Sequence, residues 1–208
     1  MIKNKKVTDP RIHDIVGEID GGHVLDIGCV QHDSSKRHDP NWLHQHLYDP
    51  ADSVFGVDRD ADGVQNLRQA GYNVVTGDAE VLDLDDTYDY VVAGELIENL
   101  SNPGEFLKAA KDVLSENGRL VLTMTNIWCW ARLKHITQKD GVPYNPEHTH
   151  YHDEATLRQL LERYGYRVNI KYVAPMSEGI TRWLNRMPIR QFKRLGSTRL
   201  LVIAGVNE

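Results

Sequence analysis

The sequence predicts an α/β fold in which helices cover both faces of a doubly wound, mainly parallel sheet. The first observation is a series of short apolar runs in which β-branched residues recur. The second is that stretches with the apolar spacing of helices separate several of these runs. Because the runs are apolar on both faces, they are typical of strands buried between two layers of helices.

Six runs have the length and composition of buried strands: residues 24–27, 54–57, 74–76, 90–93, 120–124 and 200–204. Three segments between them have helical patterns: residues 60–70, 103–114 and 153–164. Each helix begins at a residue that favours the first turn, namely Asp60, Pro103 and Asp153. Gly71 and Gly165 follow the first and the third helix, as glycine commonly does at a helix end.

The composition limits the classes of protein to which this chain can belong. We expect one domain over residues 1–208, because a chain of 208 residues with 40% hydrophobic residues can bury one core. The formal net charge of −6 argues against a generally basic nucleic-acid-binding protein, and we expect no DNA partner. Two cysteines cannot form a disulfide framework. The first residues lack the apolar stretch of a signal peptide, and no segment is apolar enough to span a membrane, so we expect a cytoplasmic protein.

The end of the first predicted strand is a candidate ligand site, because ligands of open α/β sheets collect at the carboxyl ends of the strands. This strand ends in Asp26, Ile27, Gly28 and Cys29. Gly28 can adopt a positive φ and lets a ligand approach the backbone closely. Asp26 would repel phosphate, whereas it suits a ligand that carries a positive amino group.

Carboxylates also follow the second and third predicted strands. Asp58 could accept two hydrogen bonds from a ribose diol. Asp78, followed by the small residue Ala79, could contact the edge of a base. Each residue has a structural alternative: Asp58 could cap the helix over 60–70, and Asp78 begins an acidic stretch that could be solvated surface.

A nicotinamide-dependent dehydrogenase would also use an acid such as Asp58. Its Gly-x-Gly-x-x-Gly fingerprint is absent, because Val30 and Asp33 occupy the second and third glycine positions. The sequence therefore favours a cationic nucleoside ligand over NAD.

The chain resembles the class I S-adenosylmethionine-dependent methyltransferases. The similarity rests on four motifs in the family's order: Val-Leu-Asp-Ile-Gly-Cys at 24–29, Val57-Asp58, Gly77-Asp78-Ala79, and residues 88–95. The resemblance implies a Rossmann-like, mainly parallel sheet of seven strands with the last strand antiparallel. It also implies S-adenosyl-L-methionine as the cofactor, with these cofactor-binding residues: Asp26, Gly28, Cys29, Asp58, Arg59, Asp78, Ala79, Gly94 and Glu95.

The sequence departs from the family pattern after the first strand and after the fourth. Val30 and His32 stand where the family usually has glycine, so we expect the turn around the methionine part of the cofactor to differ. Asn99 stands where many relatives carry histidine, so no role of that histidine transfers to this chain. Residues 41–46 are expected to form a short helix that covers the cofactor.

Residues 147–152 read Glu-His-Thr-His-Tyr-His, in a region that borders the acceptor pocket in this family. Alternate residues face one way if the segment is extended. A hydroxyl acceptor must lose a proton, and histidine accepts protons near neutral pH, so His148 and His150 are candidate catalytic bases. Each could instead only pack or face solvent. A metal site with Glu147 or Asp153 is the other alternative, and we expect no metal, because helical metal motifs have a different spacing.

Residues 174–199 form a basic insertion between the last two strands. Four apolar residues recur in it at helical spacing: Ile180, Trp183, Leu184 and Met187. Such a helix could line a pocket for phosphate or carboxylate groups, with Arg182 and Arg186 as candidate substrate-binding residues. It could also place residues 180–194 on an anionic membrane surface, which predicts a protein peripheral to the membrane, or it could complete the core.

The leading functional hypothesis is O-methylation of a small acceptor, such as an anionic sugar, a glycan precursor or a lipid-linked intermediate. RNA methylation is an alternative because the insertion is basic. Relatives that methylate base amino groups often carry Asn/Asp-Pro-Pro-aromatic after the fourth strand. This chain has Ala-Gly-Glu-Leu at 93–96 instead, which disfavours methylation of base amino groups. A third hypothesis is a non-catalytic nucleoside-binding module with the same fold.

Overall fold

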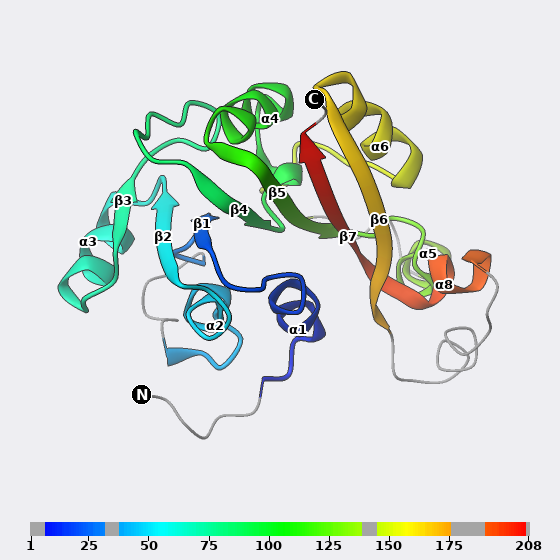
Figure 1. The fold of residues 1–208 in the computed structure, drawn as a ribbon. Coiled ribbons are helices and arrows are strands. Elements are labelled where there is room, and N and C mark those ends of the chain that lie inside the picture. Colours follow the sequence, from blue (N-terminus) through cyan, green and yellow to red (C-terminus); the bar gives the residue numbers. More distant parts are fainter. Residues whose placement is uncertain (1–6, 32–37, 139–144, 176–189, 207–208) are drawn as a thin grey trace.

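The computed structural model describes residues 7–31, 38–138, 145–175 and 190–206. A seven-stranded sheet with the order β3-β2-β1-β4-β5-β7-β6 forms its centre (Figure 1). The strands are β1 (His23–Ile27), β2 (Ser53–Asp58), β3 (Val74–Thr76), β4 (Tyr88–Gly94), β5 (Leu114–Thr125), β6 (Tyr166–Pro175) and β7 (Ser197–Val206). Strands β1 to β5 pair in parallel, whereas β7 is antiparallel to both β5 and β6. The predicted mainly parallel, doubly wound sheet with an antiparallel last strand is confirmed.

Helices cover both faces of the sheet (Figure 1). They are α1 (Pro10–Val16), α2 (Leu43–Leu47), α3 (Ala61–Gln69), the short 3₁₀ helix η2 (Ile97–Asn99), α4 (Pro103–Asp112), α5 (Trp130–Gln138), α6 (Glu154–Arg163) and α8 (Arg190–Gly196). Successive strand residues point to opposite faces, so Leu25 packs in the core under α4 and α6, while its neighbour Val24 packs under α1 and α2. This alternation explains why the strands are apolar on both faces.

Local sequence signals set several element boundaries. Asp60 caps α3 by accepting a hydrogen bond from the backbone N–H of Gly63. Asp153 and Thr156 form a capping box at the start of α6. The helix predicted over 103–114 ends at Asp112, because Leu114 already pairs with Tyr88 as the first residue of β5.

The predicted insertion at 174–199 was too wide. The ladder between β6 and β7 continues to the pair Pro175–Ser197, so Arg199 belongs to strand β7. Arg182, Arg186 and the apolar stripe of 180–187 lie outside the described residues, while 190–194 lie in α8. No helix in the described parts of the chain has the length and apolarity that crossing a membrane requires.

The topology decides which residues can meet. Parallel strands β1 to β5 end at one edge of the sheet, and antiparallel β7 begins at that same edge. In the ladder between β5 and β7, Arg199 near the start of β7 pairs with Thr125 at the end of β5. A residue late in the sequence therefore lies beside the strand ends that the sequence motifs marked.

Candidate active site

A cavity of about 640 Å³ lies at the carboxyl ends of the parallel strands. This volume is in the range of small-molecule and cofactor sites. All nine residues predicted to bind the cofactor line it: Asp26, Gly28, Cys29, Asp58, Arg59, Asp78, Ala79, Gly94 and Glu95. They come from the ends of four different strands and the turns that follow, so the fold brings together what the sequence separates by up to seventy positions.

The turn after β1 brings backbone to the cavity wall. Gly28 has φ +87°, a conformation that favours glycine, and its N–H donates to the carbonyl of Val57 at 2.8 Å. Cys29 is buried next to it. Burial, together with the negative charges of Asp26 and Asp58, raises the pKa of the Cys29 thiol far above its usual value. The thiol is therefore neutral and is not a nucleophile.

Asp58 holds two turns together at the end of β2. One carboxylate oxygen accepts from the N–H of Val30 and the other from the N–H of Asp60, each at 2.9 Å. The alternative in which Asp58 caps the helix over 60–70 is wrong, because Asp60 caps α3. An ionised carboxylate has about four acceptor positions, so both oxygens of Asp58 can still accept hydrogen bonds from a ligand.

The turn after β3 is fixed by two carboxylates. Asp78 accepts from the N–H of Glu80 at 2.9 Å. Glu80 in turn accepts from the N–H groups of Ser101 and Asn102, at 2.7 and 2.9 Å. The first acidic residues of the stretch that begins at Asp78, namely Asp78 and Glu80, thus line the cavity.

Asp26 has a side-chain partner that the sequence did not reveal. Its buried carboxylate lies 2.8 Å from Nδ1 of His44 in α2, and His44 is fully buried. The rings of Trp42, Tyr48 and Tyr72 surround the imidazole, with centroids 5.4 to 5.7 Å away. His44 thereby fixes the orientation of Asp26 at the cavity wall, where both residues lie.

Arg11 of α1 adds a positive charge to a cavity rich in carboxylates. Its Nε lies 3.3 Å from the Asp9 carboxylate, and its side chain is 12% exposed. A side chain added at Gly94 would come within 3.4 Å of the Arg11 guanidinium and 2.9 Å of Leu43, so the missing Cβ of Gly94 leaves room at this wall.

Glu95 stands where β4 ends and the cavity opens. It is a non-glycine residue with φ +57°, a strained conformation of the kind that clusters at functional sites. Its N–H donates to the carbonyl of Thr123 at 2.9 Å, and its carboxylate pairs with the Arg199 guanidinium. The antiparallel direction of β7 is what brings Arg199 to this position.

Glu98 is a buried carboxyl group that the sequence reasoning missed. It is 1% exposed, and one carboxylate oxygen accepts from the N–H of Thr125 at 3.0 Å. The other oxygen has no hydrogen-bond partner among the described residues. Burial, with the nearby charge of Glu95, raises the pKa of Glu98 to about 7. The Glu-x-x-Glu spacing of 95–98 was the only sequence signal for it.

The two candidate bases lie beside the cavity and do not line it. His148, His150 and His152 are half-buried, whereas the alternating residues 147, 149 and 151 are exposed. The three histidines therefore face the protein, as an extended segment would place them. The N–H groups of Thr149 and His150 donate to the Glu98 carbonyl at 2.8 and 3.1 Å, which ties this segment to η2, just after β4.

The environment of His148 favours its neutral form. Burial lowers its pKa, and the negative charge of Glu95 opposes this only in part. Its Nδ1 has no hydrogen-bond partner within the described part of the chain. Among residues 7–31, 38–138, 145–175 and 190–206, no group of three or more His, Cys, Asp or Glu side chains is arranged to hold a metal ion.

A comparison with protein families matches residues 5–169 to the methyltransferase domain family. The chain belongs to the class I S-adenosylmethionine-dependent methyltransferases. The matched residues include strands β1 to β5 and the first part of β6. S-adenosylmethionine is accordingly the cofactor of this methyltransferase. No curated protein matches the sequence.

Solved structures share the fold of the methyltransferase. A TehB-like methyltransferase from Corynebacterium glutamicum is 19% identical, with a TM-score of 0.60 over 99% of this chain and 90% of its own. A methyltransferase from Mesorhizobium loti is 18% identical, with a TM-score of 0.60 over 94% and 96%. A chain of the Haloferax volcanii complex between the activator Trm112 and a methyltransferase is 18% identical, with a TM-score of 0.65 over 94% and 88%.

The cavity of the methyltransferase fits its cofactor in charge and shape. S-adenosylmethionine is a cationic nucleoside, and carboxylates line the cavity at the ends of β1, β2, β3 and β4. At Gly77, a Cβ would lie 2.9 Å from Val57, and at Gly94 it would crowd Leu43. Side chains at these positions would therefore narrow the space that the cofactor requires.

Proposed function

We propose that this methyltransferase transfers the methyl group to a hydroxyl of a small acceptor. The observation that carries the proposal is the position of His148, next to the cavity-lining residue Glu147 and within reach of the negative charge of Glu95. His148 is neutral near physiological pH because burial lowers its pKa, and its Nδ1 is free of partners among the described residues. A neutral imidazole with an unused ring nitrogen can take the proton that a hydroxyl acceptor must lose.

The cofactor-binding roles follow from the cavity geometry. Asp58, whose oxygens keep acceptor positions, would bind the ribose hydroxyls. Asp78 and Ala79 would contact the adenine edge. Gly28 would allow close approach of the methionine part, with Asp26 near its amino group and Arg11 offering a cation to its carboxylate. The other predicted residues, Cys29, Arg59, Gly94 and Glu95, would complete the wall.

When bound, S-adenosylmethionine supplies a methyl group activated by a positively charged sulfur. Transfer is an in-line displacement, in which the bond from methyl to the acceptor oxygen forms as the bond to sulfur breaks. The protein's contribution is mainly alignment of the two reactants. Glu95 and Arg199 would orient the acceptor, while His148 or His150 would receive its proton.

The acceptor class we favour is an anionic sugar, a glycan precursor or a lipid-linked intermediate. Arg199 supports an acceptor with a negative group, because its guanidinium lies beside the site. Arg182 and Arg186 remain candidate substrate residues outside the described chain. A contact of 180–194 with an anionic membrane surface belongs to the same proposal, and Lys193 and Arg194 of α8 are its described cations.

The test is a panel of acceptors incubated with the protein and S-adenosylmethionine, read by mass spectrometry for the gain of one methyl group. Sugar phosphates, uronic acids and matched amines should separate hydroxyl from amino acceptors. With an acceptor in hand, His148→Gln is expected to lower kcat about a hundredfold, the usual contribution of a general base, while cofactor affinity stays unchanged. His23→Gln, at the opposite edge of the sheet, is the control. Methylation of amines alone would contradict the proposal.

RNA is the second candidate acceptor. The observation that favours it is the cationic surface of α8, with Lys193 and Arg194 near its end. Gel retardation of RNA that weakens steeply with salt, together with methylated RNA in the same assay, would replace the small acceptor by RNA.

A further inference from the structure

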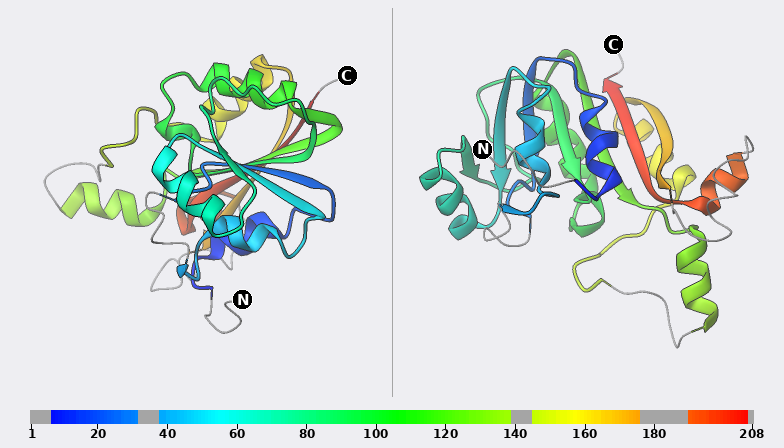
Figure 2. Two further views of the ribbon diagram at one scale, coloured as in Figure 1. Left: turned by 90° about the vertical axis from the view of Figure 1, so that its left-hand side faces the viewer. Right: turned by 90° about the horizontal axis from the view of Figure 1, so that it is seen from below.

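Helix α5 projects from the body of the described chain. Both views of Figure 2 show it projecting from the end of the sheet beyond β5. None of its residues is buried. Trp130 is 40% exposed and Ile136 is 42% exposed, and Trp128 just before the helix is 40% exposed. Large apolar side chains gathered at an exposed position mark interaction sites.

The exposed apolar residues of α5 form one stripe. At 100° per residue, Trp130, Leu133 and Ile136 fall within an arc of about 120° around the helix axis. Arg132 and Lys134 flank this arc on its two sides. An apolar stripe with cations at its borders is the pattern of helices that lie in a membrane interface, where aromatic rings sit at headgroup level.

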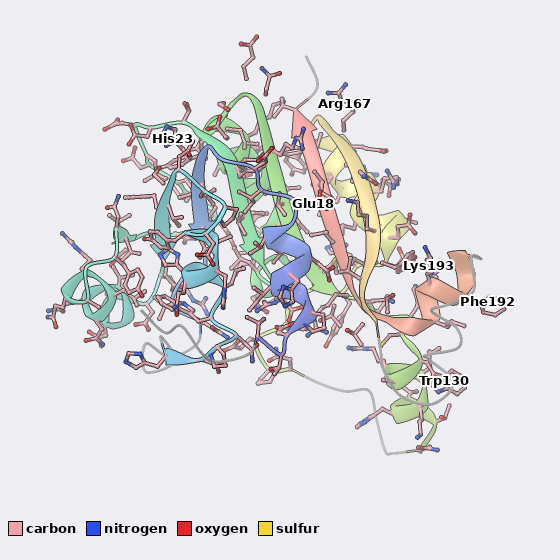
Figure 3. All side chains as sticks on the ribbon, turned by 60° about the horizontal axis from the view of Figure 1, so that its bottom comes forward. Glu18, His23, Trp130, Arg167, Phe192 and Lys193 are labelled. Atoms are coloured by element: carbon pink, nitrogen blue, oxygen red, sulfur yellow. The ribbon has the colours of Figure 1, made fainter. Side chains whose placement is uncertain are left out.

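The end of the molecule that carries α5 differs in charge from the chain as a whole. The protein carries a formal net charge of −6, yet residues 126–138 contain no Asp or Glu and include Arg132, Lys134 and His135. Helix α8 also has only cationic charges. Figure 3 shows Trp130 of α5 and Phe192 and Lys193 of α8 at the same end of the molecule.

Three contacts connect these elements into one surface. The Arg194 guanidinium lies 5.5 Å from the centre of the Trp128 ring, and the Arg194 carbonyl accepts from Nδ2 of Asn126 at 2.6 Å. On the other side, the Arg132 guanidinium lies 4.6 Å from the centre of the Tyr151 ring. The surface of α5, Trp128 and α8 therefore continues into the segment that holds His148 and His150.

We propose that α5, together with Trp128 and Lys193 of α8, docks the methyltransferase on an anionic lipid surface. Charge complementarity favours lipid over a second copy of this chain, because a two-fold contact through this face would oppose cations to cations. The exposed Trp and Ile side chains distinguish the surface from a purely electrostatic contact with nucleic acid.

The docking surface also narrows the acceptor class. Tyr151 joins the docking surface to the histidine segment. An acceptor that reaches the cavity from this side would therefore come from the membrane, as a lipid or a lipid-linked headgroup. This consequence rests on the proposed function, to which the membrane contact of Lys193 also belongs, whereas docking through α5 and Trp128 does not.

The experiment is co-sedimentation of the full chain with vesicles of phosphatidylcholine alone and of phosphatidylcholine with phosphatidylglycerol. We expect binding to the anionic vesicles, and weaker binding as salt rises. Lys134→Glu should lower the vesicle affinity about fivefold or more, from the loss of one cation near the surface. Trp130→Ser should lower it about tenfold, because an interfacial apolar contact is lost.

Two matched controls lie at the other end of the sheet. Arg68→Glu in α3 makes the same charge change, and Val81→Ser removes an apolar side chain that is 72% exposed. Both should bind anionic vesicles as the unchanged protein does. Equal losses in the controls, or no binding to anionic vesicles, would overturn the proposal.

Three further measurements separate lipid docking from internal packing, self-association and nucleic-acid binding. A marked fall in Tm of Trp130→Ser would mean that this face packs within the protein, and self-association abolished by the same substitution would assign it to a second copy. Retardation of RNA that Trp130→Ser and Lys134→Glu abolish, without vesicle binding, would assign it to nucleic acid. Each result overturns lipid docking.

Calorimetry with S-adenosylmethionine tests the proposed function separately, and the α5 variants should bind it normally.

Discussion

Asp58 and Asp78, which line the cavity, differ from Glu98 and His148, which do not, in how their polar atoms are satisfied. Asp58 accepts from two backbone N–H groups and Asp78 from one. Around η2 and the histidine segment, several buried polar atoms have no hydrogen-bond partner in the described chain: Glu98 Oε2, Asn99 Oδ1, Thr123 Oγ1, His148 Nδ1, His150 Nε2 and His152 Nε2. In the cavity wall, Gln31 Oε1 and His44 Nε2 also have none among the described residues.

Buried polar groups are nearly always hydrogen-bonded, and each one left unpaired costs about 1–3 kcal/mol. A cluster of such groups therefore indicates a place that an acceptor or water completes. The carboxylates of Asp58 and Asp78, in contrast, are held in place by backbone N–H groups of turns at the cavity wall. In the proposed function, the methyltransferase thus combines a preorganised half at Asp58 and Asp78, which would hold the cofactor, with a half around η2 and the histidine segment, whose unpaired polar atoms would meet the acceptor.

Glu98→Gln gives the largest expected effect. The folded-state pKa of Glu98, about 7, lies above the ordinary value of 4.5, so the folded protein binds more protons than the unfolded chain between these values. Stability should accordingly fall as pH rises from about 4.5 to 7, by up to about 3 kcal/mol for this group alone. In Glu98→Gln that fall should disappear. Denaturant unfolding at several pH values measures it.

Glu105→Gln is the matched control, because Glu105 is an exposed carboxylate on α4. It should keep the pH dependence of the unchanged protein. If Glu98→Gln also kept it, the buried carboxyl of Glu98 would not be the group whose titration lowers the stability as pH rises.

Asp58→Ala tests the preorganised half. Hydrogen bonds to a charged group contribute about 1.5–3 kcal/mol, so losing the carboxylate should weaken binding of S-adenosylhomocysteine about thirtyfold. Calorimetric titration measures the affinity. Asp62→Ala, an exposed carboxylate in the first turn of α3, should bind as before. Undiminished affinity in Asp58→Ala would remove Asp58 from the cofactor site.

Gly56→Ala should have a smaller effect, on stability. A Cβ at Gly56 would lie 2.7 Å from Val74, 2.8 Å from Cys29 Sγ and 2.9 Å from His44, so the packing behind Asp26 must shift. Overpacking of this kind costs about 1–3 kcal/mol, which thermal unfolding would show as a lower Tm. Gly205→Ala, where no atom lies within 4 Å of the added Cβ, should leave Tm unchanged. Equal Tm values for both variants would mean that the β1–β2 packing is loose.

The same contrast separates what the sequence could predict from what it could not. The strand ends carry their information locally: an apolar run followed by Gly28, Asp58 or Asp78 can be recognised in a few residues, and the parallel topology then brings those ends together. The predicted boundaries failed where pairing decided them, as at Leu114, which follows a helical pattern and yet begins β5.

Other site residues depend on contacts between distant segments. Arg11, His44 and Arg199 each reach the site through the packing of α1, α2 or β7, and no local motif marks them. Glu98 has only the Glu-x-x-Glu spacing of 95–98 as a local signal. The sequence pattern groups Arg199 with the basic insertion, because only the β6–β7 ladder shows where the strand begins. His148 and His150 stay predictions as catalytic bases.

The reversed direction of β7 has a consequence for how such enzymes diverge. The chain enters this strand at the edge where methyl transfer takes place, and leaves it at the far edge. Substitutions at the start of β7, where Arg199 pairs with Glu95, thus act on this edge of the cavity, whereas Asp58 and Asp78, several strands away, are untouched. A new specificity can arise there without rebuilding the half of the enzyme that holds the methyl donor.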